Sequence, residues 1–182
     1  MKSPLFAVGL LLLTGCSTLS EQDCRQADWF QIGVRDGRFG EPAALLQQHQ
    51  TACDRYAVVD GAAYEAGRVQ GLQDYCKLEN ALRLGLNGLR YKGTCPAEVD
   101  MRFNRYNSTA LTVYSLRQQL AECQGRIGHQ ENKMLIGRDS LKARSELRIL
   151  QRERERLQTE LQLQQRELEQ MMQEARSLSA KP

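Results

Sequence analysis

A heptad pattern of apolar residues in the last third of the chain constrains the fold more than any other sequence feature. From residue 147 onward these residues recur in alternating steps of three and four, with Arg154 and Gln164 as the polar members. Such spacing places the side chains along one stripe of a helix and is typical of a coiled coil. The predicted seam consists of Leu147, Leu150, Arg154, Leu157, Leu161, Gln164, Leu168, Met171, Ala175 and Leu178.

A shorter seam precedes this one in the sequence. Between the two seams, Gly125, Gly128 and Gly137 weaken the helix, because each glycine lowers helix stability by about 1 kcal/mol relative to alanine. We therefore expect a coiled coil over residues 111–180, with a break or a phase shift near 125–140. The first seam consists of Val113, Leu116, Leu120, Cys123 and Ile127.

The residues beside the main seam bear on how two such helices could pair. The g positions are all glutamate, whereas the neighbouring e positions are glutamine. An antiparallel homodimer would bring glutamates together, and a parallel one would place each glutamate beside a glutamine. We therefore expect a parallel homodimer or a partner helix with basic e positions; the alternative is a single amphipathic helix folded back on the domain that precedes it. The g positions are Glu146, Glu153, Glu160, Glu167 and Glu174, and the e positions are Gln151, Gln158 and Gln165.

The N-terminus has the pattern of an export signal. Lys2 precedes an apolar run over residues 4–13, which is shorter than the roughly 20 residues that a membrane-spanning helix needs. The run ends in Leu13-Thr14-Gly15-Cys16, which resembles the bacterial lipobox. We expect residues 1–15 to be a signal peptide and Cys16 to become the lipidated first residue of the mature chain. The alternative is an ordinary cleavage nearby, with Cys16 left as a free thiol.

Lipidation of Cys16 would set the location of the protein. Two or three acyl chains, such as palmitate, anchor a protein stably in a membrane. Ser17 rather than aspartate follows Cys16, which is similar to enterobacterial lipoproteins that are sorted to the outer membrane. We therefore expect an outer-membrane lipoprotein whose body faces the periplasm, with residues 16–23 as a lipidated linker.

The other cysteines predict a disulfide-stapled domain. Disulfides persist in the periplasm, and the sequence contains no Cys-x-x-Cys redox motif. We favour the pairs Cys24 with Cys53 and Cys76 with Cys95, because each closes a local loop, while other pairings stay open. The remaining thiol, Cys123, lies on the first seam and could form an interchain disulfide in a parallel dimer. The alternative for Cys123 is a buried or lipid-proximal free thiol.

Spaced glycines between these cysteines predict short helices that pack closely. The pairs are Gly33 and Gly37, Gly67 and Gly71, and Gly85 and Gly88. Glycines four apart share one helix face, where the missing side chains let a neighbour approach. The alternative is a run of β-hairpins with turns at Asp36-Gly37 and Asn87-Gly88. We also expect a helix from Pro42 to Tyr56, with Leu45, Leu46, His49 and Cys53 on one face.

The motifs in this region together resemble a known family. They run Asp28-Trp29-Phe30-x-Ile-Gly33-x-x-Asp36-Gly37-x-x-Gly40, His49-x-x-x-Cys53, Asp60-x-x-x-Tyr64-x-x-Gly67-x-x-x-Gly71-Leu72-x-x-Tyr75-Cys76 and Gly85 through Tyr91-x-Gly93-x-Cys95-Pro96. This ordered string is similar to the bacterial lipoprotein family known as Domain of Unknown Function 2799, over about residues 23–120. The chain departs from the family pattern at Tyr106-Asn107-Ser108-Thr109. The resemblance implies an envelope location and a folded domain at 24–110, and it implies no activity.

Several kinds of chemistry find no support in the sequence. The net charge of +3 is spread over interleaved residues, so no nucleic-acid partner is expected. His49 and His129 are the only histidines, and no spacing predicts a metal site or a cofactor. We expect His49 to be a packed or capping residue. Asp36 and Asp60, each followed by glycine, are expected to form turns.

The combined prediction is a mainly α protein: a small stapled domain of short helices, followed by a long C-terminal coiled-coil helix. Its predicted role is that of a membrane-tethered structural or interaction protein, a scaffold that acts through the coiled coil on an envelope protein or the cell wall. The alternative is a small periplasmic hydrolase or ligand-binding domain with a cleft near His49. We do not expect an enzyme, because no catalytic motif is present.

Overall fold

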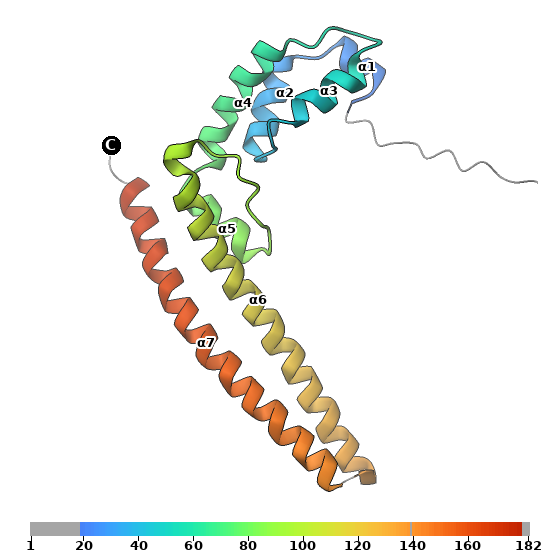
Figure 1. Ribbon diagram of the computed structural model, residues 1–182, viewed down its shortest axis with the longest axis vertical. Helices are drawn as coiled ribbons and strands as arrows, with labels where there is room; N and C mark the ends of the chain where they lie inside the picture. Colours follow the sequence, from blue (N-terminus) through green and yellow to red (C-terminus); the bar gives the residue numbers. More distant parts are fainter. Residues whose placement is uncertain (1–18, 139, 180–182) are drawn as a thin grey trace, which may run out of the picture.

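The computed structural model describes residues 19–138 and 140–179, so the expected signal peptide, Cys16 and Ser17 lie outside the described residues. Within these ranges every regular element is a helix, which confirms the mainly α fold and excludes the β-hairpin alternative. Figure 1 shows α1 to α4 gathered at one end, while α6 and α7 run side by side away from them. The elements are α1 (Glu21–Arg25), α2 (Trp29–Arg38), α3 (Leu45–Cys53), α4 (Gly61–Tyr75), α5 (Leu78–Leu86), α6 (Ala97–Lys133), the π-helical turn η1 (Met134–Arg138) and α7 (Leu141–Ser179).

Helices α2 and α4 cross with their backbones in direct contact, because each presents glycines to the other. A Cβ atom added to Gly33 would lie 2.9 Å from the backbone nitrogen of Arg68, and closer still to the carbonyl oxygen of Tyr64. Real Cβ atoms essentially never approach other atoms so closely. The glycine spacing therefore allows a tight helix crossing, as predicted. The facing residues are Gly33 and Gly37 on α2, and Gly67 and Gly71 on α4.

Aspartate side chains fix where these two helices begin. Asp28 precedes α2 and accepts a hydrogen bond from the backbone N–H of Gln31 at 3.1 Å. Asp60 precedes α4 and accepts one from the backbone N–H of Ala63 at 2.9 Å. Each bond satisfies an N–H group that has no partner within its helix. Asp60 is therefore a helix N-cap, and the prediction that it forms a turn was wrong.

Helix α3 is shorter than the sequence predicted. It begins at Leu45 rather than at Pro42, because residues 43 and 44 form a turn before the helix. His49 and Cys53 are its buried residues, and they lie on the face that the sequence predicted. The helix is therefore docked through these two side chains.

Two disulfides connect the short helices to one another. Cys24 of α1 is bonded to Cys53 at the end of α3, and Cys76 after α4 is bonded to Cys95 before α6. These are the pairs that the closure of local loops favoured. The first bond lies within the hydrophobic core of α1 to α4. A covalent link thus supplements a core that is small.

A second core forms where the end of α7 returns to α5 and the beginning of α6. Phe103 and Tyr106 of α6 are buried there, and Leu168, Met171 and Ala175 of α7 belong to the same cluster. The domain limit expected at residue 110 falls inside α6, which continues without interruption to Lys133. The end of the predicted coiled coil is therefore part of the folded domain.

A buried asparagine fixes the loop between α5 and α6. Asn107 accepts a hydrogen bond from the backbone N–H of Tyr91 at 2.8 Å. Its Nδ2 donates to the carbonyl oxygens of Leu89 at 2.9 Å and Ala81 at 3.2 Å. In the sequence, Asn107 stood out only as a departure from the family pattern. Its role is to satisfy backbone groups that would otherwise be buried without partners.

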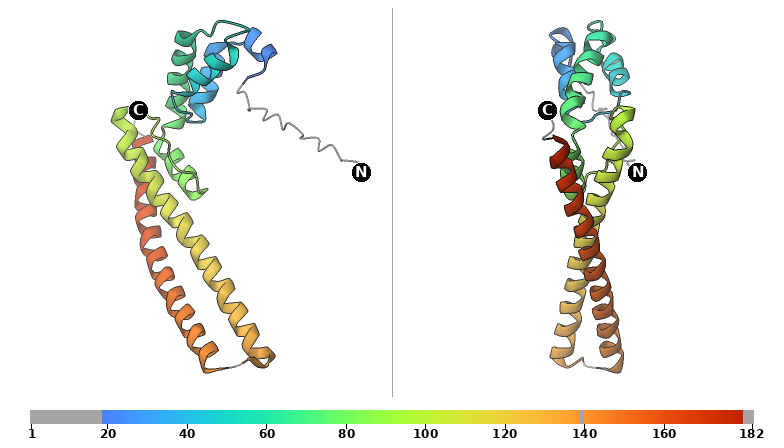
Figure 2. Two further views of the ribbon diagram at one scale, coloured as in Figure 1. Left: turned by 45° about the vertical axis from the view of Figure 1, so that its right-hand side comes forward. Right: turned by 90° about the vertical axis from the view of Figure 1, so that its left-hand side faces the viewer.

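The long helical region reverses direction at η1. Ile136 and Gly137 leave the helical conformation, and Gly137 has φ 81°, a value that suits glycine. Helix α7 then runs back antiparallel to α6, as both views in Figure 2 show. This confirms the break that the sequence predicted near 125–140. Gly125 and Gly128, in contrast, stay inside α6.

The main seam is covered by α6 of the same chain. The alternative of a helix that folds back therefore describes this structure in part: the end of α7 reaches the domain, and the rest of α7 packs on α6. A parallel homodimer through the seam stays a prediction for a chain whose hairpin has opened. The hairpin turn makes α6 the nearest available partner, since pairing within one chain needs no second copy. Of the predicted seam, Leu150, Leu157, Leu168 and Met171 are buried, and Leu147 and Leu161 are partly buried.

Glutamates of α7 meet polar residues of α6 in this arrangement. Gln130 Nε2 donates to Glu146 Oε2 at 3.2 Å, and Arg126 Nη1 lies 3.5 Å from Glu153 Oε2. The expected clash of glutamate with glutamate applies only to two copies of α7. Because α6 has a different sequence, antiparallel pairing within the chain avoids that repulsion.

Cys123 lies inside the hairpin. Its side chain is 2% exposed, and its Sγ donates a hydrogen bond to the carbonyl oxygen of Leu150 at 3.4 Å. Among the described cysteines it is the one without a disulfide. The alternative of a buried free thiol fits this structure, whereas an interchain disulfide at Cys123 would require the hairpin to open.

The close crossing of α2 and α4 predicts a sharp contrast between two glycine substitutions. Gly33→Ala should destabilise the protein by about 3 kcal/mol, since the backbone of α4 leaves no room for a methyl group. Gly125→Ala is the matched control, because a Cβ there meets nothing within 4 Å, and it should stabilise α6 by up to about 1 kcal/mol. Urea unfolding followed by circular dichroism measures both. Equal stability of the two variants would contradict the crossing.

Candidate functional site

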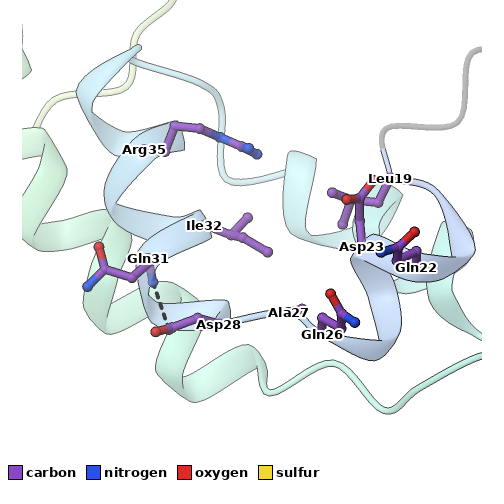
Figure 3. Close-up of a pocket in the computed structure, with 9 residues that line it drawn as sticks. All are labelled: Leu19, Gln22, Asp23, Gln26, Ala27, Asp28, Gln31, Ile32 and Arg35. Atoms are coloured by element: carbon purple, nitrogen blue, oxygen red, sulfur yellow. Dashed lines mark hydrogen bonds between the residues drawn. The ribbon is translucent and has the colours of Figure 1, made fainter.

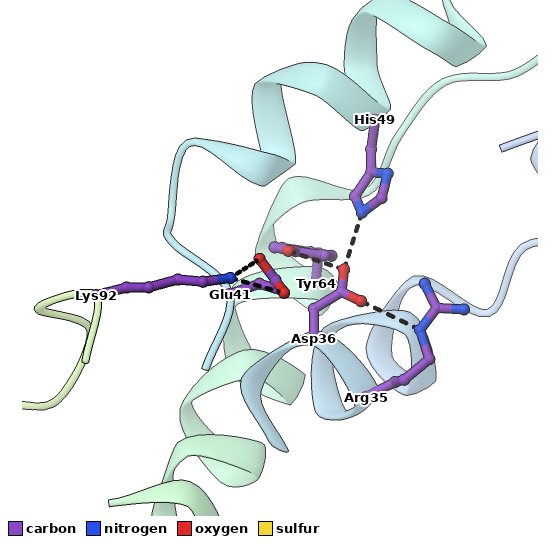
Figure 4. A network of polar contacts seen from close by, with 6 residues as sticks. All are labelled: Arg35, Asp36, Glu41, His49, Tyr64 and Lys92. Carbon is purple, nitrogen blue, oxygen red and sulfur yellow. Dashed lines mark hydrogen bonds and ion pairs between the residues drawn. The ribbon is translucent and has the colours of Figure 1, made fainter. Parts of the chain in front are cut away.

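A buried polar cluster joins α2, α3 and α4, and it contains the residues that could carry chemistry. The Nε2 atom of His49 lies 2.8 Å from Oδ2 of Asp36, and the hydroxyl of Tyr64 donates to the same oxygen at 3.2 Å. Figure 4 shows His49 from α3 and Tyr64 from α4 converging on the Asp36 carboxylate of α2. Asp36 lies inside α2, so the prediction that it forms a turn was wrong.

The Asp36 carboxylate also contacts the side chain of Arg35. Nε of Arg35 donates to Oδ1 of Asp36 at 3.1 Å, and the Arg35 side chain is half-exposed. Burial, together with the negative charge of Asp36, raises the pKa of the Tyr64 hydroxyl above its usual value. Tyr64 therefore keeps its proton and acts as a hydrogen-bond donor in this cluster.

The cluster is sealed from solvent. Exposure is 2% for His49, 4% for Asp36 and 0% for Tyr64. The rings of Trp29 and Tyr64 lie against the imidazole, with centroids 6.3 Å and 5.6 Å away. A substrate could not reach these groups without separation of the helices. The arrangement serves to connect three helices, and the prediction that His49 is a packed residue agrees with this position.

A surface ion pair nearby connects the segment after α2 to the loop before α6. Lys92 Nζ donates to Oε1 and Oε2 of Glu41 at 3.0 and 2.9 Å. Glu41 follows α2, and Lys92 lies in the loop before α6, so the pair bridges segments far apart in the sequence (Figure 4). Both side chains are partly exposed, which limits the contribution of such a pair to stability.

Shallow grooves lie on the surface away from His49, two of them beside α1 and α5. The first, of about 580 Å³, runs between α1 and α2, and Figure 3 shows that polar side chains line most of it. The second, of about 310 Å³, lies between α5 and α7 and is mainly apolar. Residues of the second groove are Glu79, Leu82, Arg83, Leu86, Asn87, Met172 and Arg176. His49, Asp36 and Tyr64 line neither groove, so the cleft expected near His49 is not found at these sites.

No group of three or more His, Cys, Asp or Glu side chains in residues 19–138 and 140–179 could hold a metal ion. Across the same ranges, the helices all lack the length and apolar character needed to cross a membrane.

The hairpin of α6 and α7, here called the arm, carries the residues of both predicted seams. Most of its seam side chains are buried or partly buried between α6 and α7, so they hold the arm together, whereas Leu178 at the end of the seam is exposed. Sequence reasoning missed three apolar residues at the turn, Leu135, Ile136 and Leu141, which are strongly exposed. Leu135 and Ile136 lie inside the predicted break and Leu141 directly follows it, and none of the three belongs to either seam.

The comparison with known families bears on the stapled domain. Residues 28–112 match the family model described as protein of unknown function (DUF2799). Residues 28–112 therefore form a domain of this family. The matched range covers α2 to α5 and the first part of α6, and it includes Asp36, His49 and Tyr64. No curated protein and no solved structure shows a significant match to the chain.

The DUF2799 domain should depend on the buried charge of Asp36. Asp36→Asn should destabilise the protein by about 3 kcal/mol, because His49 and Tyr64 lose the carboxylate that they both contact. Asp74→Asn is the matched control: Asp74 contacts Lys77 and Arg38 but is half-exposed, so its change in unfolding free energy should be much smaller. Equal urea midpoints for the two variants would show that the cluster adds little.

Proposed function

We propose that the protein is an outer-membrane lipoprotein, anchored through Cys16, that acts in the periplasm as a structural or interaction scaffold. The stapled DUF2799 domain would lie near the membrane, and the hairpin of α6 and α7 would project from it toward an envelope protein or the cell wall. The projecting hairpin is the observation that carries this proposal.

The dimensions of the hairpin support such a role. Helices α6 and α7 contain 37 and 39 residues, and each is about 55 to 60 Å long at 1.5 Å per residue. Figures 1 and 2 show the turn η1 at the end of the molecule opposite to α1, where the described chain begins. A lipid anchor before Leu19 would thus hold the end of the molecule at α1 near the membrane. The turn η1 would then lie at the far end of the molecule, where a partner could contact it.

The alternative of a hydrolase draws no support from the geometry. His49 and Asp36 are buried, and the described partners of the Asp36 carboxylate are His49, Tyr64 and Arg35, none of which is a serine or cysteine nucleophile. A catalytic triad needs a nucleophile within hydrogen-bond reach of the base.

The buried seam changes where a partner of the scaffold would bind. The apolar seam of α7 packs within the chain and is therefore not available to a partner helix. Partners would contact the outer faces or the turn of the arm.

The proposed anchor predicts where three forms of the protein are found in fractionated cells. The natural chain should sediment with the outer membrane, and Cys16→Ala should become soluble, because an unacylated chain loses its anchor. Ser17→Asp should move to the inner membrane, by similarity to lipoprotein sorting. Density-gradient separation followed by immunoblotting measures all three, and a Cys16→Ala chain that stays with the outer membrane would contradict the anchor.

The role of the arm can be tested by shortening it rather than by cutting it off. Deletion of residues 140–182 would remove Leu168, Met171 and Ala175 from the second core and destabilise the domain. Deletion of residues 117–130 together with 143–156 instead removes two heptads from each helix and brings Leu116 toward Leu157. The arm then loses about 20 Å while the heptad phase is kept.

The shortened arm should fail to restore envelope integrity in a strain that lacks the natural protein, measured as growth in detergent. His49→Gln is the comparison variant, since it alters the buried cluster and leaves the arm intact, and it should restore growth wherever it is folded. The opposite pattern, growth with the short arm and none with folded His49→Gln, would favour a site in the stapled domain. Circular dichroism and immunoblotting verify folding and abundance.

A further inference from the structure

The turn of the hairpin carries a concentrated group of exposed apolar side chains. Leu135, Ile136 and Leu141 are 82%, 73% and 84% exposed. Exposed apolar residues elsewhere in the described chain, such as Val58 and Met101, are separated along the sequence. Single exposed residues of this kind are ordinary, whereas a cluster marks a binding surface. The arm therefore ends in a surface that water solvates poorly.

Two lysines flank this apolar group. Lys133 ends α6 and Lys142 lies at the beginning of α7, and both are exposed. We define the tip by Lys133, Leu135, Ile136, Leu141 and Lys142. Apolar side chains beside lysines match the interface of an anionic bilayer, where acyl chains receive the apolar groups and phosphates attract the ammonium groups.

We propose that the tip binds the surface of a lipid bilayer that contains anionic phospholipids. This inference rests on the proposed function, because the arm has to present the tip away from the tether. The turn between α6 and α7 lies at the end of the molecule in both views of Figure 2, so a flat surface can reach it without contacting the stapled domain.

The backbone at the tip favours shallow insertion. Gly137 and Ile136 interrupt the helix, and peptide groups at such a break need partners that the hydrocarbon core cannot supply. Interfacial segments insert their apolar side chains only about 5–10 Å, at the level of the headgroups and the first methylenes. At that depth water and phosphate still contact the backbone. The tip is thus suited to contact a bilayer and not to span it.

Vesicle flotation of the mature chain carrying Cys16→Ser tests the inference without a lipid anchor. The chain should float with vesicles of equal parts phosphatidylglycerol and phosphatidylethanolamine, and more weakly with phosphatidylcholine vesicles. Substitution of the three apolar residues, Leu135→Ser, Ile136→Ser and Leu141→Ser, should lower the partition coefficient at least about tenfold. Lys133→Gln and Lys142→Gln should each lower it about fivefold on the anionic vesicles.

The control is a triple variant at exposed apolar residues outside the tip. Phe39→Ser, Val58→Ser and Met101→Ser replace side chains that are 70%, 94% and 84% exposed, and this variant should bind as the parent does. Absence of binding by the parent chain would overturn the inference, as would equal binding by the tip variant or equal binding to both kinds of vesicle. The growth assay separates this inference from the scaffold proposal. If the parent chain binds no vesicle and the tip variant still fails to restore growth, the lipid inference is wrong and the tip contacts a protein. The scaffold proposal then stands.

Discussion

Both hydrophobic cores of the domain depend on close contact between helix backbones, which glycine makes possible. Gly33 and Gly37 lie against α4, and in the second core Gly85 lies against the backbone of α6 at Asn107. Removing the side chain at a crossing brings the helix axes closer together than larger residues allow. In the first crossing, this proximity lets Asp36 and Tyr64 share a hydrogen bond. The polar cluster thus depends on glycines that have no chemistry of their own.

The hairpin adds a second level of organisation, because α7 contributes to two cores. Near the turn its seam covers the first seam of α6, and at its far end Leu168 and Met171 complete the core of α5 and α6. Neither part of α7 can be lost without exposing apolar surface elsewhere. The break at Ile136 and Gly137 permits this arrangement, since the positive φ of Gly137 takes the chain out of the helix before α7 begins.

The sequence predicted those features that follow from local patterns. Glycine spacing indicated close helices, loop closure favoured the observed cysteine pairs, and three glycines indicated a break. The identity of the helix that covers the seam was not predictable in this way, because a heptad pattern defines a stripe and not its partner. Asp36-Gly37 was misread for a similar reason: the dipeptide favours a turn locally, whereas the partners of Asp36 come from α3 and α4. Tertiary contacts decided the outcome there.

The geometry of the hairpin also limits what a dimer of this chain could look like. If α7 exchanged between two copies, each α7 would still pack antiparallel on an α6, and Glu153 would again meet Arg126. Cys123 would then face Leu150 of the other copy, as it faces Leu150 within one chain. The separation of 27 residues between these two positions would place the two Cys123 residues about 40 Å apart on an extended pair of helices. A disulfide between two Cys123 residues is therefore incompatible with an exchanged dimer and requires α6 to face α6 directly, as in the parallel dimer, after the hairpin has opened.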